Sequence, residues 1–131
     1  MPVELPPDAR ALLDRPVCAT LATINPDGQP QLSVVWVKRD GDDILVSTVT
    51  GRQKYRNLLR DPRATVLVFD PEDPDHYVEV RGHVSMTEEG GPELIQELGW
   101  RYNGERFSGD EGTDRVRVVV RLTPDRVVVR H

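Results

Sequence analysis

The sequence has few of the features that mark secreted, metal-binding or membrane proteins. It contains one cysteine, Cys18, so no disulfide can form within the chain. The zinc-site spacings C-x-x-C and H-E-x-x-H do not occur. No apolar run approaches the ~18 residues of a membrane-spanning helix, and the N-terminus has no apolar signal core. We therefore expect a cytoplasmic protein with no metal site and no membrane span, and we interpret Cys18 as a small core residue.

Positive charge is also in deficit. The chain has 17 Lys and Arg against 22 Asp and Glu, a formal net charge of -5. An acidic chain lacks the basic face that displaces counterions from nucleic acid, so we expect no nucleic-acid partner. The charge is uneven, however: residues 52–63 carry five cations and one acid, whereas residues 70–75 carry four acids. A local basic cluster on an acidic protein favours a small anionic ligand over a polymer.

Short apolar segments separated by turn-forming residues indicate the fold class. Strands are predicted at 17–24, 31–38, 44–48, 64–69, 77–86, 116–122 and 127–129. Hairpin turns join most of them, as at the Asn-Pro-Asp-Gly of 25–28, whereas a doubly wound parallel sheet needs repeated βαβ crossovers. The pattern predicts a single domain, 1–131, that is mainly β with marginal helices and forms an antiparallel barrel of six or seven strands.

Three helices and several loops complete the prediction. The helices begin at Pro6-Pro7-Asp8, with Ala9, Leu12 and Leu13 on one face; at Gly51, with Tyr55, Leu58 and Leu59 on one face; and at Gly91-Pro92, with Leu94, Leu98 and Tyr102 at helical spacing. A charged loop is predicted at 70–75, a loop or lid at 103–113, and a turn at 123–125.

The most informative segment is 51–58, which follows a predicted strand and begins a helix. Free N–H groups and the helix dipole favour an anion at such a position. Arg52 and Lys54 lie in the first turn, where one can bind a phosphate through two N–H groups and the other adds a compact charge. Hydroxyl groups end the preceding strand: Ser47, Thr48 and Thr50. The alternative is a solvated basic helix face, to which we assign Arg56 and Arg60.

A second cluster lies in the first predicted hairpin. Small side chains at Ala22 and Thr23, and at 30–33, would let a planar ring approach the backbone. Gln31 and Ser33 project to the same face of a strand and could hydrogen-bond a ring carbonyl or a ribityl hydroxyl. Ordinary strand pairing with Trp36 in the core explains the same residues, so both interpretations stay open.

Three segments together resemble a known family: 19–23 (ATLAT), 27–33 (DGQPQLS) and 51–63 (GRQKYRNLLRDPR). They are similar to the pyridoxamine 5'-phosphate oxidase-related split-barrel superfamily, and within it to the F(420)-dependent class B proteins of actinobacteria. The run K-x-R-N-L-x-R-D-P-R is the most specific part. The resemblance extends over nearly the whole chain, through Val80-Arg81-Gly82 and Trp100-Arg101-Tyr102.

The resemblance implies a six-stranded split β-barrel that pairs as a homodimer, with two cofactor sites at the subunit interface. It implies a phosphate site that consists of Arg52, Lys54, Ser47 and Asn57. It implies a deazaflavin ring near Ala22, Thr23, Pro30, Gln31 and Ser33. The partner subunit would close the pocket through Tyr77 and residues 100–102.

The implied activity is an F(420)-dependent oxidoreductase that transfers hydride from C5 of the reduced deazaflavin to an unsaturated small-molecule acceptor. No residue is assigned a catalytic role, although Tyr102 is a candidate proton donor. The chain ends at 130–131 without the longer C-terminal segment of the FMN-dependent oxidases, which argues against true pyridoxamine phosphate oxidase activity. One alternative is an FMN-binding oxidoreductase of the same fold. Another is a non-catalytic cofactor-binding or haem-binding barrel with His76 or His83 as axial ligand.

Overall fold

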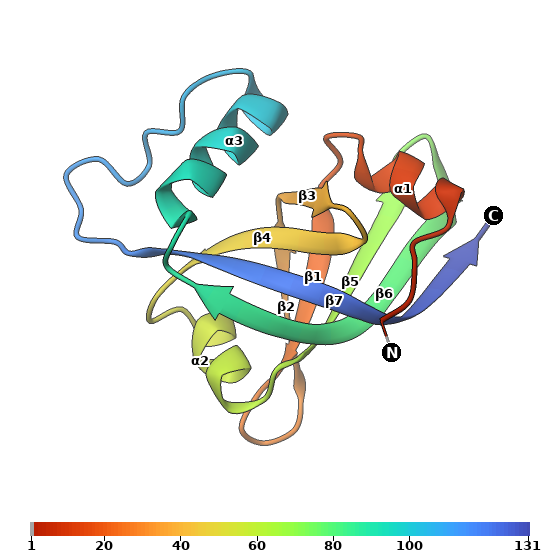
Figure 1. Cartoon of the computed structure of the whole chain (residues 1–131), viewed down its shortest axis with the longest axis horizontal. Coiled ribbons are helices and arrows are strands. Elements are labelled where there is room, and N and C mark those ends of the chain that lie inside the picture. Colours follow the sequence, from red (N-terminus) through yellow and green to blue (C-terminus); the bar gives the residue numbers. More distant parts are fainter. Residues whose placement is uncertain (1) are drawn as a thin grey trace.

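The computed structural model describes residues 2–131, which form one antiparallel sheet of seven strands curled into a half-barrel (Figure 1). The strand order is β2-β1-β5-β6-β7-β4-β3. In that order the strands are Pro30–Val35, Ala19–Ile24, Arg63–Asp70, Asp73–Thr87, Arg117–Arg130, Asp43–Val49 and Val37–Asp40. The mainly β class and the marginal helices are confirmed, whereas the expectation of six strands is wrong.

The first difference from the predicted strand boundaries lies at Trp36. The segment 31–38, predicted as one strand, is divided there into β2 and β3. These two consecutive strands lie at opposite edges of the sheet, since β2 pairs with β1 and β3 pairs with β4. The chain therefore passes from one sheet edge to the other within one residue, and the sheet has to curl so that its edges approach each other at Trp36.

Strand β7 is continuous where the sequence predicts a turn at 123–125. The register of β6 and β7 shifts between Arg81 and Gly82, so that Gly82 pairs with Pro124. A Cβ on Gly82 would lie 2.1 Å from the carbonyl oxygen of Thr123. Because this glycine has no side chain, the strands can approach closely enough to hold a β-bulge, and a bulge is where a sheet accommodates proline.

The prediction of a charged loop at 70–75 is wrong. Strand β5 continues to Asp70 and β6 begins at Asp73, so the connection is a tight turn with a register shift at Phe69 and Asp70. The amide N–H of Glu72 donates a 2.9 Å hydrogen bond to the Asp70 carboxylate, which closes the turn locally.

The helices are α1 (Pro7–Leu13), α2 (Gln53–Arg60) and α3 (Gly91–Asn103). Ala9, Leu12 and Leu13 of α1 are buried as predicted, and so are Leu94 and Leu98 of α3. The predicted apolar face of α2 is only partly right, because Leu58 is buried whereas Leu59 is 64% exposed. Asn57 occupies the buried position beside Leu58 instead.

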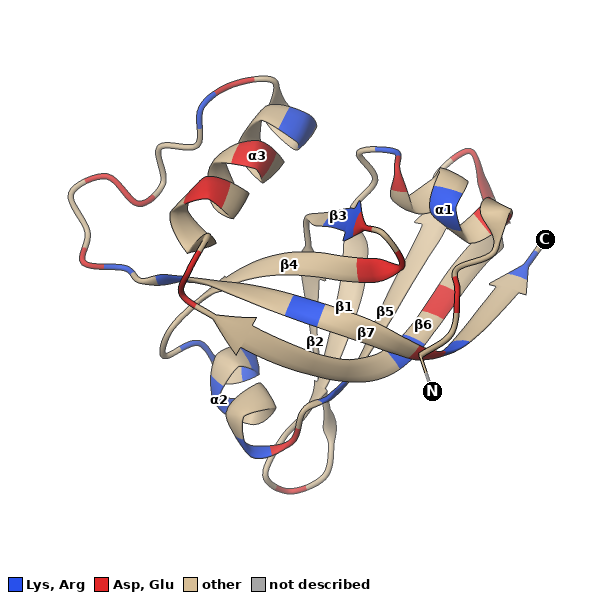
Figure 2. Ribbon diagram, viewed as in Figure 1, with Lys and Arg blue, Asp and Glu red and all other residues tan. Residues whose placement is uncertain are grey.

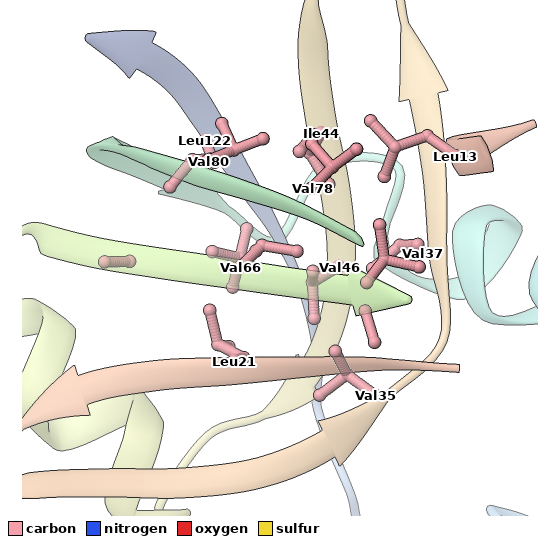
Figure 3. Close-up of a cluster of buried hydrophobic side chains, with 14 of the residues drawn as sticks. Leu13, Leu21, Val35, Val37, Ile44, Val46, Val66, Val78, Val80 and Leu122 are labelled. Carbon is pink, nitrogen blue, oxygen red and sulfur yellow. The ribbon is translucent and has the colours of Figure 1, made fainter. Parts of the chain in front are cut away.

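The main core fills the concave side of the curled sheet (Figure 3). Side chains of alternate residues on each strand meet there, among them Leu21, Val66, Val80 and Leu122. Cys18 does not belong to this core: it is exposed, because it precedes β1 on the side opposite to Ala19 and Leu21. In the part of the chain that the structure describes, no helix has both the length and the apolar character needed to cross a membrane.

Candidate anion and cofactor site

A cavity of about 210 Å³ lies where the start of α2, the end of β4, the Trp36 corner and α3 meet. Its polar wall consists of Ser47, Thr48, Arg52, Lys54 and Arg117. Its apolar wall includes Val34, Trp36, Ile95 and Phe107. Figure 2 shows Lys and Arg gathered along α2, whereas acidic residues mark α3. The cavity thus offers positive charge at one side and aromatic surface at the other.

The backbone at the start of α2 favours an anion. Gly51 has a φ of +89°, which a residue with a side chain adopts at a cost, and this turn directs β4 into the helix. Arg52 is the N-cap in extended conformation, and no side chain among residues 2–131 caps the helix by a hydrogen bond. The N–H groups of the first turn are therefore available to a ligand at the positive end of the helix.

Lys54 is held at the cavity with its charge uncompensated. Its Nζ donates a 3.0 Å hydrogen bond to Ser33 Oγ, and within residues 2–131 it has no carboxylate partner. Burial lowers the pKa of Lys54, and the nearby charges of Arg52 and Arg117 lower it further. An anion bound among these three cations would raise the pKa of Lys54 again.

Thr48 supplies a test of whether an oxygen-rich ligand fits the cavity. Its side chain is 2% exposed, and its Oγ1 is buried without a hydrogen-bond partner anywhere in the described chain. Buried hydroxyl groups are normally satisfied, because an unmade hydrogen bond costs about 1–3 kcal/mol. A phosphate oxygen at the cavity wall would satisfy this hydroxyl, so the donor set fits a phosphorylated cofactor.

Arg117 is the member of the site that sequence reasoning missed. It begins β7, opposite Val49 of β4, so this strand pairing brings it beside Ser47. It contacts Asp110 at 2.7 Å and 3.0 Å, and its guanidinium lies 5.0 Å from the centre of the Phe107 ring. No local motif marks this arginine, because its place depends on the pairing of strands far apart in the sequence.

The residues predicted around a ring divide between the two faces of the sheet. Ser33 faces the cavity through Lys54, and Thr23 and Gln31 lie on the same side, joined by a 2.7 Å hydrogen bond between their side chains. Ala22 lies on the outer face, where it lines a separate cavity of about 280 Å³. Pro30 is exposed and pairs with Ile24 at the end of the hairpin. Successive residues of a strand face opposite sides, so Ala22 and Pro30 lie on the opposite face of the sheet from Thr23, Gln31 and Ser33.

Asn57 supports the site rather than lining it. Its side chain accepts a hydrogen bond from Gln53 Nε2 at 2.8 Å and donates to Thr23 Oγ1 and Asn25 Oδ1, both at 3.0 Å. Both Asn57 and Thr23 are 0% exposed. The amide thus binds α2 to the β1–β2 hairpin and fixes where Lys54 and Arg52 lie.

The outer face of β2, β1 and β5 is apolar and uncovered. Leu32, Val34, Leu67 and Phe69 are 62%, 72%, 38% and 45% exposed. The register places Val34, Thr20 and Leu67 in one row across the three strands. Exposed apolar surface that is continuous over several strands indicates a protein–protein interface.

Comparison with known proteins identifies the family of the chain. The sequence pattern described as pyridoxamine 5'-phosphate oxidase matches residues 5–131. The chain belongs to this family. Among solved structures, a protein named F(420) reductase is 33% identical, with a TM-score of 0.85 over 95% of this chain and 98% of that one. The family resemblance inferred from the three sequence segments, including its F(420)-dependent group, is confirmed.

Two further relatives extend the comparison. A conserved hypothetical protein from Mycobacterium tuberculosis is 29% identical, with a TM-score of 0.78 over 98% of this chain and 86% of that one. General Stress Protein 26 from Bacillus anthracis is 18% identical, with a TM-score of 0.73 over 94% of this chain and 91% of that one, and so shares the fold.

In this family member Tyr102 is a structural residue and not an available proton donor. Its hydroxyl accepts a 3.0 Å hydrogen bond from the Val37 N–H and lies 2.9 Å from the Val17 carbonyl oxygen, to which it donates. Burial raises the pKa of Tyr102, and its ring stacks on Trp36 at 5.3 Å. Arg101 donates to two backbone carbonyls, so of residues 100–102 only Trp100, 60% exposed, remains free for a partner subunit.

Each histidine considered as a haem ligand makes a hydrogen bond through its Nδ1. His76 Nδ1 lies 2.9 Å from the carbonyl oxygen of Arg130, and its ring stacks on that of His131. His83 is exposed and bonded to Asp125. From residue 2 onward, no group of three or more His, Cys, Asp and Glu is placed to hold a metal ion.

Proposed function

We propose that this protein is an F(420)-dependent oxidoreductase that transfers hydride from the reduced deazaflavin to an unsaturated small-molecule acceptor. The observation that carries the proposal is the cavity at the start of α2, which Arg52 and Lys54 line, and where the charged neighbours of Lys54 are cations. The similarity to a protein named F(420) reductase, over nearly the full length of both chains, supports the choice of cofactor.

The chain's own residues would bind and orient the cofactor. Arg52 and Lys54 would hold the phosphate, with Ser47, Thr48 and the free N–H groups of α2 completing its hydrogen bonds. Trp36 and Phe107 would exclude water from the apolar side of the cavity. The bound deazaflavin supplies hydride chemistry at its C5, so the protein has to position and shield the reactants rather than provide a nucleophile.

We propose further that the functional unit is a homodimer with the cofactor at the subunit interface. The apolar outer face of β2, β1 and β5 supports this, because a monomer would leave Leu32, Val34 and Phe69 in water. Ala22 and Pro30, separated from the cavity within one chain, lie on or beside that face and would meet a ring held between two subunits. Tyr77 and Trp100 remain the candidates for closing the site from the partner.

FMN is the alternative cofactor, because the matching family is described by an oxidase of pyridoxamine 5'-phosphate. Its phosphate would meet the same two cations, so the fold and the site would be unchanged. The electron donor and the oxidative half of the reaction would then differ.

A fluorescence titration with oxidised F(420), run beside FMN at equal ionic strength, tests the proposal. We expect saturable binding of F(420) with a dissociation constant below that of FMN. Reduced F(420) should then be oxidised by the protein in the presence of a quinone or an enoate. Tighter binding of FMN would move the protein to the flavin branch, and binding of neither cofactor would overturn the proposed function.

A further inference from the structure

Arg117 directs one edge of its guanidinium into the cavity. Its Nε and Nη2 donate hydrogen bonds to the two carboxylate oxygens of Asp110, at 2.7 Å and 3.0 Å. Its Nη1 lies 3.4 Å from Ser47 Oγ, at the limit of a hydrogen bond. Arg117 and Ser47 both line the cavity, whereas Asp110 does not. The carboxylate thus fixes the guanidinium from behind and leaves an N–H edge facing the space beside Arg52 and Lys54.

The surroundings of Arg117 limit its motion. Its side chain is 12% exposed and lies over the Phe107 ring, which meets Trp36 edge-on at 6.2 Å. Phe107 is in turn held by Gln96, which accepts from its N–H and donates to its carbonyl oxygen. The Arg117 backbone is fixed as well, because a Cβ on Gly91 at the start of α3 would lie 2.1 Å from its carbonyl oxygen.

The charges at the cavity do not balance. Arg52, Lys54 and Arg117 line it, and the carboxylate of Asp110 compensates only the last of them. Two positive charges therefore remain, in a space that is partly shielded from water. Three fixed cations with two net charges complement a ligand that carries at least two negative charges close together, such as a phosphate with a neighbouring carboxylate or a terminal phosphate.

We infer that Arg117 is a third binding residue for the anionic part of the cofactor, held in place by Asp110 and Phe107. This inference rests on the proposed function for the identity of the cofactor, but not for the presence of an anion site. It also gives the segment after α3 a role, because Asp110 and Phe107 fix the position of the guanidinium that the ligand contacts. A ligand with one negative charge would bind this site more weakly than a ligand with two.

The test compares Arg117→Gln with Arg115→Gln, which is matched because Arg115 also contacts Asp110, at 3.5 Å, but does not line the cavity. We expect Arg117→Gln to weaken F(420) binding roughly 10- to 100-fold, as for loss of a charged hydrogen bond, and Arg115→Gln to change it less than about twofold. The salt dependence of binding should become shallower only in Arg117→Gln. Arg117→Lys, which keeps the charge and the fold, should give an intermediate loss.

A second measurement separates this inference from the proposed function. Inorganic pyrophosphate is titrated into wild type and Arg117→Gln by isothermal titration calorimetry, which requires neither the cofactor nor turnover. Pyrophosphate binding that Arg117→Gln weakens would support the inference even if neither F(420) nor FMN binds. Equal affinities of wild type and Arg117→Gln for pyrophosphate and for F(420) would overturn it, even if F(420) supports turnover. No pyrophosphate binding by the wild type would also overturn it.

Discussion

The side-chain amide of Asn57 donates a 3.0 Å hydrogen bond to the hydroxyl of Thr23, and neither residue has any exposed surface. This contact joins α2 to β1 across 34 positions of the chain. Helix α2 carries Lys54 and the β1–β2 hairpin carries Ser33, so the pair determines how Lys54 meets Ser33. Asn57 therefore links the stability of the fold to the position of Lys54, although it does not itself line the cavity.

Removing that amide should destabilise the fold. Asn57→Ala leaves Gln53 Nε2 and Asn25 Oδ1 without side-chain partners and Thr23 with one fewer, so we expect a loss of about 2–3 kcal/mol in the free energy of unfolding. Chemical denaturation followed by circular dichroism measures it. Leu59→Ala on the same helix is the control, because this leucine is exposed and should change stability by less than about 0.5 kcal/mol. Equal losses in the two variants would contradict the support role of Asn57.

Lys54 should contribute directly to cofactor binding. Lys54→Ala removes a half-buried cation that faces the cavity, and we expect F(420) binding to weaken by about 1.5–3 kcal/mol. Isothermal titration or cofactor fluorescence gives the dissociation constants. Arg60→Ala is the control, since Arg60 lies on the same helix but donates to the Ile24 carbonyl and does not line the cavity. An unchanged affinity in Lys54→Ala would remove this residue from the site.

The lowered pKa of Lys54 also predicts a pH dependence. Burial and the charges of Arg52 and Arg117 disfavour the protonated amine in the free protein, whereas a bound anion favours it. Binding therefore takes up a proton at alkaline pH: affinity is full at neutral pH and falls as the pH rises through the lowered pKa. Titrations from neutral to alkaline pH measure this fall. Lys54→Arg keeps its charge over that range and should abolish the part of the fall that belongs to Lys54.

A charge on the outer face should dissociate the proposed dimer. Leu67→Glu places a carboxylate in the row formed with Val34 and Thr20, so we expect a monomer by light scattering and loss of cofactor binding. Leu59→Glu is the matched control, because this leucine is exposed on α2 and lies outside that row. If wild type is itself monomeric at the concentrations that bind cofactor, the dimer proposal is wrong.

Several elements could be predicted because their signals are local. The helix at the N-terminus, the turn between β1 and β2, and the anion-favouring start of α2 follow from proline, glycine and charge at fixed spacing. The predictions fail where contacts between segments far apart in the chain determine the local structure. Pro124 signals a turn by itself, but Gly82 on the neighbouring strand lets β7 continue through it. Leu59 looks like a core residue by helical spacing, but the buried hydrogen bonds of Asn57 orient α2 differently.

The sequence by itself determined the mainly β class, the family, and the candidate phosphate residues on α2, because these depend on spacing within short segments. Only the tertiary structure decided which residues share a cavity with them. In the tertiary structure Ala22 lies on the opposite face of the sheet from Ser33, Tyr102 is hydrogen-bonded to the backbone, and Arg117 lies beside Ser47 at the cavity. The physical reason is that strand pairing and sheet curvature join residues far apart in the chain, and no local pattern encodes which strands will be neighbours.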